Sequence, residues 1–330
     1  MENEERKIPV LYLVVPCYNE EEVVEKSAQV MGDKLRRLIG EGKIDSESKI
    51  MFVNDGSKDN TLWLLHQIAA KDPMYSVVSL AGNYGHQSAI LAGMMTARTH
   101  ADAVVTIDAD LQQDIEALDK FLASYMAGSE VVYGVRNDRH SDGTFKKSSA
   151  TIYYKLMHLL GSKVIANHAD YRLMSRKALD ALSEYRETNL FLRGLIPTMG
   201  FASDVVYFDV KKREAGQSKY TLAKMMTLAI DGITSMSVTP LRMIAVIGFC
   251  VCIFSFVMCV ISLAEWVQGK NVPGYTTSLI VSLIMGGITL LSLGIIGEYI
   301  GKIYMETKKR PRYIIDTVVW KKGGEHDDND

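Results

Sequence analysis

Residues 103–114 read AVVTIDADLQQD, an apolar run that ends in two closely spaced aspartates. Its first part, Ala103–Ile107, is a short apolar run rich in β-branched residues, which is typical of a buried strand. The carboxylates Asp108 and Asp110 follow directly. Such a pair suits Mg²⁺ or Mn²⁺ bound together with a diphosphate, because these cations take few protein carboxylates and fill their shell with phosphate and water oxygens. Acidic residues at strand ends also cap helices, so the pair alone leaves both interpretations open.

The same pattern repeats along the first part of the chain. Apolar runs of strand length alternate with segments of helical periodicity, which predicts an α/β fold with a mostly parallel sheet covered on both faces. The expected strands are Val10–Val15, Ile50–Val53, Ser76–Leu80, Ala103–Ile107 and Glu130–Val135, and the expected helices are Glu21–Ile39, Thr61–Ala70, Gln87–Arg98 and Ile115–Ala127. Ligands of such sheets bind beyond the carboxyl ends of the strands.

Polar clusters follow three more of these strands. Pro16–Glu20 follows the first, Asn54–Ser57 the second and Gly82–Gly85 the third. Asp55 either belongs to a plain turn or accepts hydrogen bonds from a base or ribose, and Asn19 either caps the next helix or binds a nucleotide. The sequence has no GxGxxG after the first strand and no GxxxxGK[ST], which disfavours dinucleotide-binding oxidoreductases and P-loop enzymes.

In combination these segments are far more specific than any of them alone. Val14–Glu21, Val53–Thr61 and Asp108–Asp114 occur in this order on successive strands. This order resembles the inverting family 2 glycosyltransferases with a GT-A fold. Within them it is similar to the polyprenyl-phosphate glycosyltransferases, namely bactoprenol glucosyltransferases of the GtrB type and dolichol-phosphate mannose synthases. The resemblance continues through Gly82–His86, Tyr133–Arg136, Asp170–Arg176, Phe191–Gly194, Gly216–Tyr220, Thr239–Arg242, Gly297–Tyr304 and Arg310–Tyr313.

One departure from the family pattern follows the acidic pair. The family often has Asp-Pro-Pro at this place, whereas this chain has Gln113, Asp114 and Ile115. The sequence therefore does not predict the conformation of this turn, but it retains the two aspartates expected to bind the metal. The QxxRW motif of processive synthases is absent from the sequence, which disfavours a polymer-extruding enzyme.

The resemblance implies roles for individual residues. Asp108 and Asp110 would hold the diphosphate and the Mg²⁺ or Mn²⁺ ion, with Asp110 as the direct ligand, and Gln112 would lie beside the sugar. Asp170 is similar to the acceptor-side carboxylate of the family. It acts either as a base or as a residue that orients the acceptor or the sugar, because a lipid phosphate is anionic and attacks without losing a proton. The nucleotide would be held by Pro16, Tyr18, Asn19, Glu20 and Asp55.

An acceptor phosphate explains several basic residues. A phosphate monoester carries about −1.5 to −2 charges near neutral pH, which favours Arg forks and Lys point charges around it. The expected phosphate ligands are Arg136, Arg193, Arg213 and Lys219, and Arg193 is also expected to be catalytic. Lys211 and Lys212 serve either this phosphate or lipid headgroups. His86 and His168 are not expected to bind metal.

Two uncharged apolar runs, Met243–Ala264 and Thr276–Gly297, are each long enough for the roughly 20 residues that cross a bilayer core as a helix. Thr221–Thr239 has amphipathic helical periodicity, which indicates a helix on the membrane surface or a soluble core helix. Basic residues flank the two runs on their outer sides, whereas the linker Glu265–Tyr275 holds a single Lys. The positive-inside bias therefore predicts a catalytic domain and two termini in the cytoplasm.

These expectations combine into one interpretation. The chain divides into a GT-A domain (1–220), an interfacial helix (221–240), a transmembrane hairpin (241–300) and a cytoplasmic tail (301–330). It is expected to be a multi-pass protein of the cytoplasmic membrane that moves glucose from UDP-glucose onto undecaprenyl phosphate, making a lipid-linked donor for cell-envelope glycans. Nucleotide-sugars carrying N-acetylglucosamine, mannose or aminoarabinose are the alternative donors. A transferase with a soluble or diacylglycerol acceptor and a non-catalytic membrane scaffold are the alternatives.

The expected partners are a nucleotide-sugar donor, a polyprenyl phosphate acceptor and the bilayer. The net charge of −2 gives no electrostatic case for nucleic-acid binding. Two spans are too few to form a flipping channel alone, so a homo-oligomer such as a tetramer stays an open expectation.

Overall fold

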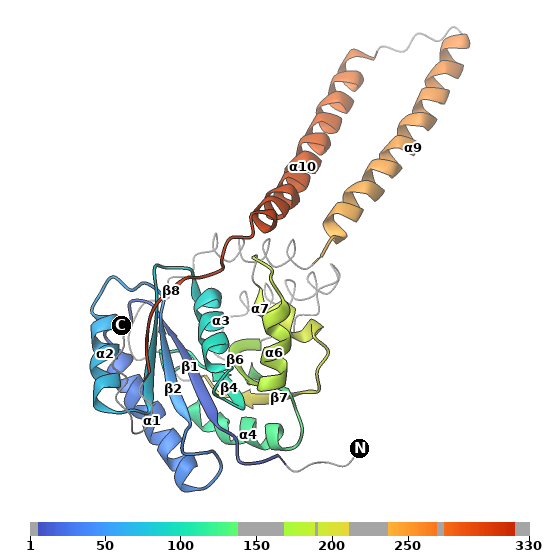
Figure 1. The fold of residues 1–330 in the computed structure, drawn as a ribbon. Helices are drawn as coiled ribbons and strands as arrows, with labels where there is room; N and C mark the ends of the chain where they lie inside the picture. Colours follow the sequence, from blue (N-terminus) through green and yellow to red (C-terminus); the bar gives the residue numbers. More distant parts are fainter. Residues whose placement is uncertain (1–5, 138–167, 189–190, 211–236, 269–273, 321–330) are drawn as a thin grey trace. The chain divides into compact units, whose positions relative to one another are not determined.

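The structure is a computed structural model that describes residues 6–137, 168–188, 191–210, 237–268 and 274–320. The chain divides into two compact units. The first contains a sheet with helices on both faces, and the second contains two long apolar helices (Figure 1).

The sheet of the first unit has eight strands within the described residues. They are β1 (Leu11–Cys17), β2 (Lys49–Asn54), β3 (Tyr75–Leu80), β4 (Ala103–Thr106), β5 (Val131–Arg136), β6 (His168–Ser175), β7 (Ser203–Phe208) and β8 (Ile315–Val319). Their order is β7-β5-β6-β4-β1-β2-β3-β8. β1 pairs in parallel with β2 and β4, β2 with β3, and β5 with β7, whereas β6 and β8 are antiparallel to their neighbours. The expected mostly parallel α/β sheet is confirmed.

The helices of this unit cover both faces of the sheet. They are α1 (Val24–Gly40), α2 (Thr61–Lys71), α3 (His86–Ala97), the short η1 (Ile115–Ala117), α4 (Leu118–Met126), α6 (Arg176–Glu184) and α7 (Leu192–Thr198). α1 buries Val24, Ala28, Met31 and Leu35, which recur at helical spacing. They share one core cluster with the β1 residues that point to that face and with the buried residues of α4.

α3 covers the other face of the sheet at close range. A Cβ atom on Gly93 would lie 2.4 Å from Cγ1 of Val14 and 2.7 Å from Cγ2 of Val53. Only a glycine therefore allows α3 to approach β1 and β2 this closely. The approach fixes the place at which α3 begins, with His86, beyond the carboxyl ends of these strands.

A buried amine joins α1 to the segment that follows the acidic loop. The side chain of Lys34 is 1% exposed and donates to Glu116 of η1 at 2.7 Å and to Asp119 of α4. Arg37 also pairs with Glu116. Because these ion pairs anchor η1 and α4, the loop between β4 and η1 is held at both ends.

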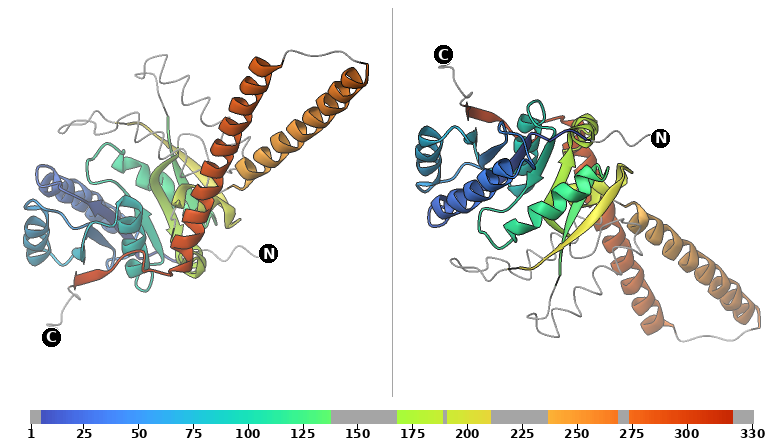
Figure 2. Two further views of the ribbon diagram at one scale, coloured as in Figure 1. Left: turned by 90° about the horizontal axis from the view of Figure 1, so that it is seen from above. Right: turned by 90° about the horizontal axis from the view of Figure 1, so that it is seen from below.

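β6, β7 and β8 are not among the strands expected from the sequence. β6 carries Asp170 and Arg172 at alternate positions, so it lacks an uninterrupted apolar run. β8 comes last among the described strands and forms one edge of the sheet by pairing with β3, and in Figures 1 and 2 it is the red strand. Trp320, directly after β8, stacks on Tyr12 with 5.6 Å between ring centroids.

The second unit contains α9 (Thr239–Val267) and α10 (Tyr275–Thr307). They include both expected apolar runs. Within them, Thr239–Met258 and Ile284–Thr307 have mean hydropathies of 2.4 and 1.5, and none of either stretch is buried. Both helices are thus long and apolar enough to cross a membrane. The expected interfacial helix, 221–240, falls almost entirely outside the described residues.

The close packing of α3 yields a stability prediction. Gly93→Ala forces a methyl group against Val14 and Val53, and overpacking of this kind costs about 1–3 kcal/mol. We expect a lower unfolding temperature for the full-length variant in detergent. Gly40→Ala is the matched control, because a Cβ atom at Gly40 meets nothing within 4 Å. Equal unfolding temperatures for the two variants would contradict the close packing of α3.

Candidate active site

The acidic loop after β4 is folded back on itself. Leu111 has a φ of 55°, in the left-handed region that non-glycine residues rarely adopt. This turn brings Gln113 back to Asp108. Nε2 of Gln113 donates to Oδ2 of Asp108 at 2.5 Å, and Oε1 of Gln113 accepts from the main-chain N of Asp108 at 3.0 Å. Oδ1 of Asp110 accepts from the main-chain N of Gln112 at 3.1 Å.

A serine of α1 holds the middle of this loop. The buried hydroxyl of Ser27 donates to the carbonyl of Ala109, between the two carboxylates. A buried carbonyl is costly without a donor, so this contact keeps the loop against α1.

Strand pairing brings a third carboxylate, that of Asp170, to the acidic loop. β6 lies antiparallel beside β4, with Arg172 opposite Thr106. The hydroxyl of Thr106 donates to the carbonyl of Asp170 at 2.6 Å. Because β4 ends at Thr106, this register places Asp170 next to the loop that starts at Asp108, although the two are far apart in the chain.

Asp170 is the centre of a buried ion cluster. Nη2 of Arg172 donates to Oδ1 at 2.5 Å, while Nε and Nη2 of Arg193 donate to Oδ1 and Oδ2 at 3.1 and 2.7 Å. The side chains of Asp170 and Arg172 are 6% and 0% exposed, and that of Arg193 is 40% exposed. Burial alone would raise the pKa of Asp170, but Arg193 and Arg172 outweigh it and hold this pKa well below its usual range.

His86 lies between the acidic loop and the ion cluster. Its Nε2 is 3.6 Å from Oδ1 of Asp108 and 3.7 Å from Oδ2 of Asp170, and its side chain is 48% exposed. The next residue, Gln87, accepts from the main-chain N of Leu192 at 2.8 Å, at the start of α7. The beginning of α3 therefore contributes one side chain to the site and positions the helix that carries Arg193.

Asp55 organises the loop that leads into α3. Its Oδ1 and Oδ2 accept from the main-chain N of Tyr84 at 2.7 Å and of Gly85 at 2.9 Å. Burial raises the pKa of Asp55, although these two hydrogen bonds act in the opposite direction. Gly56 has a φ of 64°, and a Cβ atom there would lie 2.5 Å from the carbonyl carbon of Gly82. The turn at Asp55–Gly56 thus packs closely against the loop 82–85.

The loop after β1 is tied to the loop after β2. Asn19, at a φ of 53°, donates from its main-chain N to Oγ of Ser57 at 3.1 Å and accepts at Oδ1 from the main-chain N of Lys58 at 2.8 Å. The main-chain N of Glu20 donates to the hydroxyl of Thr61 at 2.8 Å. Asn19 and Glu20, two of the expected nucleotide-binding residues, are thus fixed against the loop after β2. Of the other expected residues in this segment, Pro16 is buried in β1 and Tyr18 is exposed.

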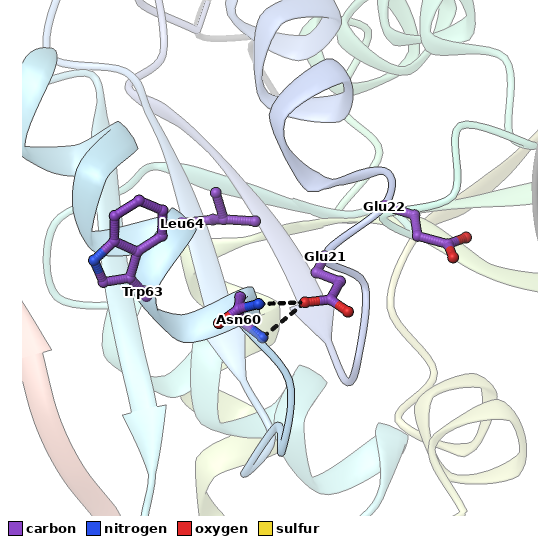
Figure 3. A pocket seen from close by; sticks show the side chains of 5 residues that line it. All are labelled: Glu21, Glu22, Asn60, Trp63 and Leu64. Carbon is purple, nitrogen blue, oxygen red and sulfur yellow. Dashed lines mark hydrogen bonds between the residues drawn. The ribbon is translucent and has the colours of Figure 1, made fainter.

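An open depression of about 650 Å³ borders these two loops. Figure 3 shows Oε2 of Glu21 accepting from the main-chain N and the side-chain Nδ2 of Asn60, at 3.0 and 2.9 Å. Glu22, Trp63 and Leu64 complete the lining. None of the carboxylates around Asp108 and Asp170 belongs to this lining, so the depression is separate from them.

The donor set of the acidic loop fits a hard divalent cation. No group of three or more His, Cys, Asp or Glu side chains suited to a metal occurs among the described residues. Asp108 and Asp110 instead supply two carboxylates, the number that Mg²⁺ or Mn²⁺ uses when diphosphate and water oxygens complete its shell. Burial, with the nearby carboxylates, raises the pKa of Asp108, and His86 opposes this. A cation at this place would relieve that repulsion.

Of the expected ligands of the acceptor phosphate, the structure places only Arg193 next to Asp170. Arg193 reaches Asp170, whereas Arg136 is exposed at the end of β5 and its side chain makes no hydrogen bond or ion pair with the described residues. Arg213 and Lys219 lie outside the described residues. Arg172, Gln113 and Ser27 are not among the expected site residues. Position next to Asp108–Asp110 is a sequence signal for Gln113, whereas Ser27 carries none because its contact depends on helix packing.

A mostly parallel α/β sheet with an acidic pair and a third carboxylate at one edge is typical of enzymes that bind phosphorylated nucleotides at the strand ends. Residues 12–183 match the family described as glycosyl transferase family 2. The chain belongs to this family, and its sheet has the GT-A fold.

Curated relatives match along most of the chain. A Bacillus subtilis (strain 168) protein named as the uncharacterized glycosyltransferase YkoT is 44% identical, over 93% of this chain and 91% of that protein. The bactoprenol glucosyl transferase of Shigella phage SfX is 39% identical, over 92% of this chain and 97% of that protein. The prophage bactoprenol glucosyl transferase homolog of Escherichia coli (strain K12) is 37% identical, over 93% of this chain and 98% of that protein.

The ion cluster yields a prediction on stability and pH. Asp170→Asn leaves the buried Arg172 without its counter-charge, which costs about 3–5 kcal/mol at pH 7. Because the folded-state pKa of Asp170 is depressed, the stabilisation is present above the ordinary Asp value of about 3.9 and is lost as the pH falls below it. The gap in unfolding temperature between wild type and variant should therefore shrink below about pH 4.

Asp180→Asn serves as the control for this series, because Asp180 is 57% exposed and pairs with Arg98 at the surface. A gap of the same size at pH 7 and at pH 3, or an equal gap in the control, would contradict the assignment of the buried pair.

Proposed function

We propose that this protein transfers glucose from UDP-glucose to undecaprenyl phosphate at the cytoplasmic face of the membrane. The observation that carries the proposal is the position of His86, whose Nε2 lies 3.6 Å from the acidic loop at Asp108 and 3.7 Å from the Asp170–Arg193 pair. A site for a metal-bound diphosphate is thus adjacent to a guanidinium that suits a second phosphate. Relatives named bactoprenol glucosyl transferase support this choice of donor and acceptor.

The donor binds on the acidic side of the site. Asp108 and Asp110 hold the diphosphate through Mg²⁺ or Mn²⁺, which when bound neutralises charge on the departing diphosphate. The surface made by the loops after β1 and β2, which Asn19 ties together, faces the nucleotide. Asp55 supports this surface through its contacts with Tyr84 and Gly85, and it has lone pairs left to accept from the base or ribose.

The acceptor phosphate binds on the basic side. Asp170 holds Arg193 through two donors, so the planar guanidinium is fixed while 40% of its side chain stays exposed. Arg forks recognise phosphate oxygens with both charge and geometry. Arg136, Arg213 and Lys219 complete this proposed set of phosphate ligands.

Asp170 acts in this scheme as a residue that orients Arg193 and not as a base. Both of its oxygens accept from guanidinium groups, and its pKa is held well below its usual range. A general base works best when its pKa is close to the working pH. The acceptor needs no base, because its phosphate is already anionic.

The reaction is a single displacement. An oxygen of the acceptor phosphate forms a bond to the anomeric carbon of the sugar, and the bond from that carbon to the diphosphate oxygen breaks on the opposite face. The bonding electrons leave with UDP, and the configuration at the anomeric carbon inverts. α9 and α10 keep the protein in the bilayer that contains the acceptor, and the basic residues that flank them favour a cytoplasmic catalytic domain.

A transfer assay tests the function directly. Purified full-length protein is given undecaprenyl phosphate, Mn²⁺ and one labelled donor at a time, namely UDP-glucose, UDP-N-acetylglucosamine or GDP-mannose. We expect labelled lipid from UDP-glucose, and a loss of at least about 100-fold in Asp110→Asn, because a metal ligand supplies several kcal/mol to the transition state. Asp33→Asn, an exposed change on α1, is the control.

Three results would count against the proposal. Transfer to diacylglycerol or to a soluble acceptor alone would replace the acceptor, and labelling from another donor alone would replace the sugar. No consumption of any sugar nucleotide, together with unchanged cellular function in Asp110→Asn, would favour a non-catalytic scaffold.

Arg193 gives a second prediction. Arg193→Lys keeps the charge but loses the fork, so we expect a higher KM for undecaprenyl phosphate, about tenfold, with a smaller change for the sugar nucleotide. Arg176→Lys is the matched control, because Arg176 follows the other end of β6, pairs with Asp102 and is exposed to a similar degree as Arg193. Equal effects on both substrates would contradict the acceptor role of Arg193.

A further inference from the structure

One buried amide in the acidic loop has no role in the proposed chemistry. Gln113 is buried, with 2% of the residue exposed. It donates to Oδ2 of Asp108 at 2.5 Å and accepts from the main-chain N of the same residue at 3.0 Å. A single amide group therefore contacts both the main chain and the carboxylate of Asp108, which fixes the rotation of that carboxylate.

The main chain on both sides of Gln113 keeps this amide in place. Leu111 turns the chain back at a φ of 55°, and Gln113 itself forms a β-bridge with Val210 after β7. The carbonyl of Asp114 accepts from the hydroxyl of Tyr171 at 3.1 Å, so β6 supports the next residue as well. The main chain that carries the amide is thus held by β6 on one side and by the segment after β7 on the other.

The contact decides which oxygen Asp108 can offer. Oδ2 is engaged by Gln113, whereas Oδ1 is directed to the side of His86, 3.6 Å from its Nε2. An ionised carboxylate in place of the amide could accept from the main chain of Asp108 but could not donate to Oδ2. The two bonds together therefore need a glutamine or a group of the same hydrogen-bonding capacity.

We propose that Gln113 is a positioning residue that presents Oδ1 of Asp108 to a divalent cation and the donor diphosphate. This inference rests on the proposed function. Residues behind a metal ligand typically change metal affinity by about 10- to 100-fold when they are lost, because they hold the ligand in its binding orientation. Gln113 contributes in this way without touching the sugar nucleotide.

Manganese binding tests the inference without relying on catalysis. Full-length protein in detergent is titrated with Mn²⁺ in the presence of UDP, and free Mn²⁺ is followed by electron paramagnetic resonance. Gln113→Met keeps the length of the side chain and removes both hydrogen bonds, and we expect about 10- to 100-fold weaker Mn²⁺ binding. Gln67→Met, on the exposed side of α2, is the matched control and should bind Mn²⁺ as wild type does.

Two further measurements separate positioning from a fold defect. Sugar transfer by Gln113→Met should recover at high Mn²⁺, so that the KM for Mn²⁺ rises while kcat stays close to that of wild type. If Gln113→Met does not fold, Gln113→Asn decides the question, because it keeps an amide that is one methylene too short to close both bonds. Weaker Mn²⁺ binding by that variant is the expected result.

The outcomes distinguish this inference from the proposed function. Wild-type affinity for Mn²⁺ in a folded Gln113 variant would overturn the role of Gln113 and leave the proposed function intact. No Mn²⁺ binding by wild-type protein with UDP would overturn both.

Discussion

The pairing of β6 with β4 is the constraint on which the site depends. It places Arg172 opposite Thr106 and brings Asp170 beside the loop that begins at Asp108. No local sequence feature could join these carboxylates, because the pairing connects distant parts of the chain. The bond from Thr106 to the carbonyl of Asp170, at 2.6 Å, fixes the register at the point where β4 ends. A shift by one residue would turn Asp170 to the opposite face of the sheet.

The ion cluster around Asp170 positions Arg193 at the expense of desolvating buried charges. Removing a carboxylate and the guanidinium of Arg172 from water is expensive, and a well-packed apolar pair would stabilise the fold as well or better. The cluster instead supplies a rigid support for Arg193, which is partly exposed. This arrangement explains why β6 contains charged residues at positions where a purely structural strand would carry valine or isoleucine.

The sequence was sufficient for the parallel half of the fold and for the acidic pair, because both depend on local patterns. The apolar runs in β1 to β5 are short and rich in β-branched residues, and Asp55 and Asp108 come within two residues of the ends of β2 and β4. β6, β7 and β8 were not predicted. β6 is interrupted by charges, and β7 and β8 are largely exposed edge strands whose partners lie far away in the chain. The contacts of Ser27 and Gln113 also could not be predicted, because they depend on helix packing and on the left-handed turn at Leu111.

The last strand, β8, has a consequence for biosynthesis. It pairs with β3 in the same sheet as the strands that precede α9. Because α9 and α10 lie between β7 and β8 in the chain, the sheet can be completed only after both of these long apolar helices have been made. During translation, the edge of β3 stays unpaired until the ribosome has made both apolar helices and β8, so an aggregation-prone edge is uncovered until the end of synthesis.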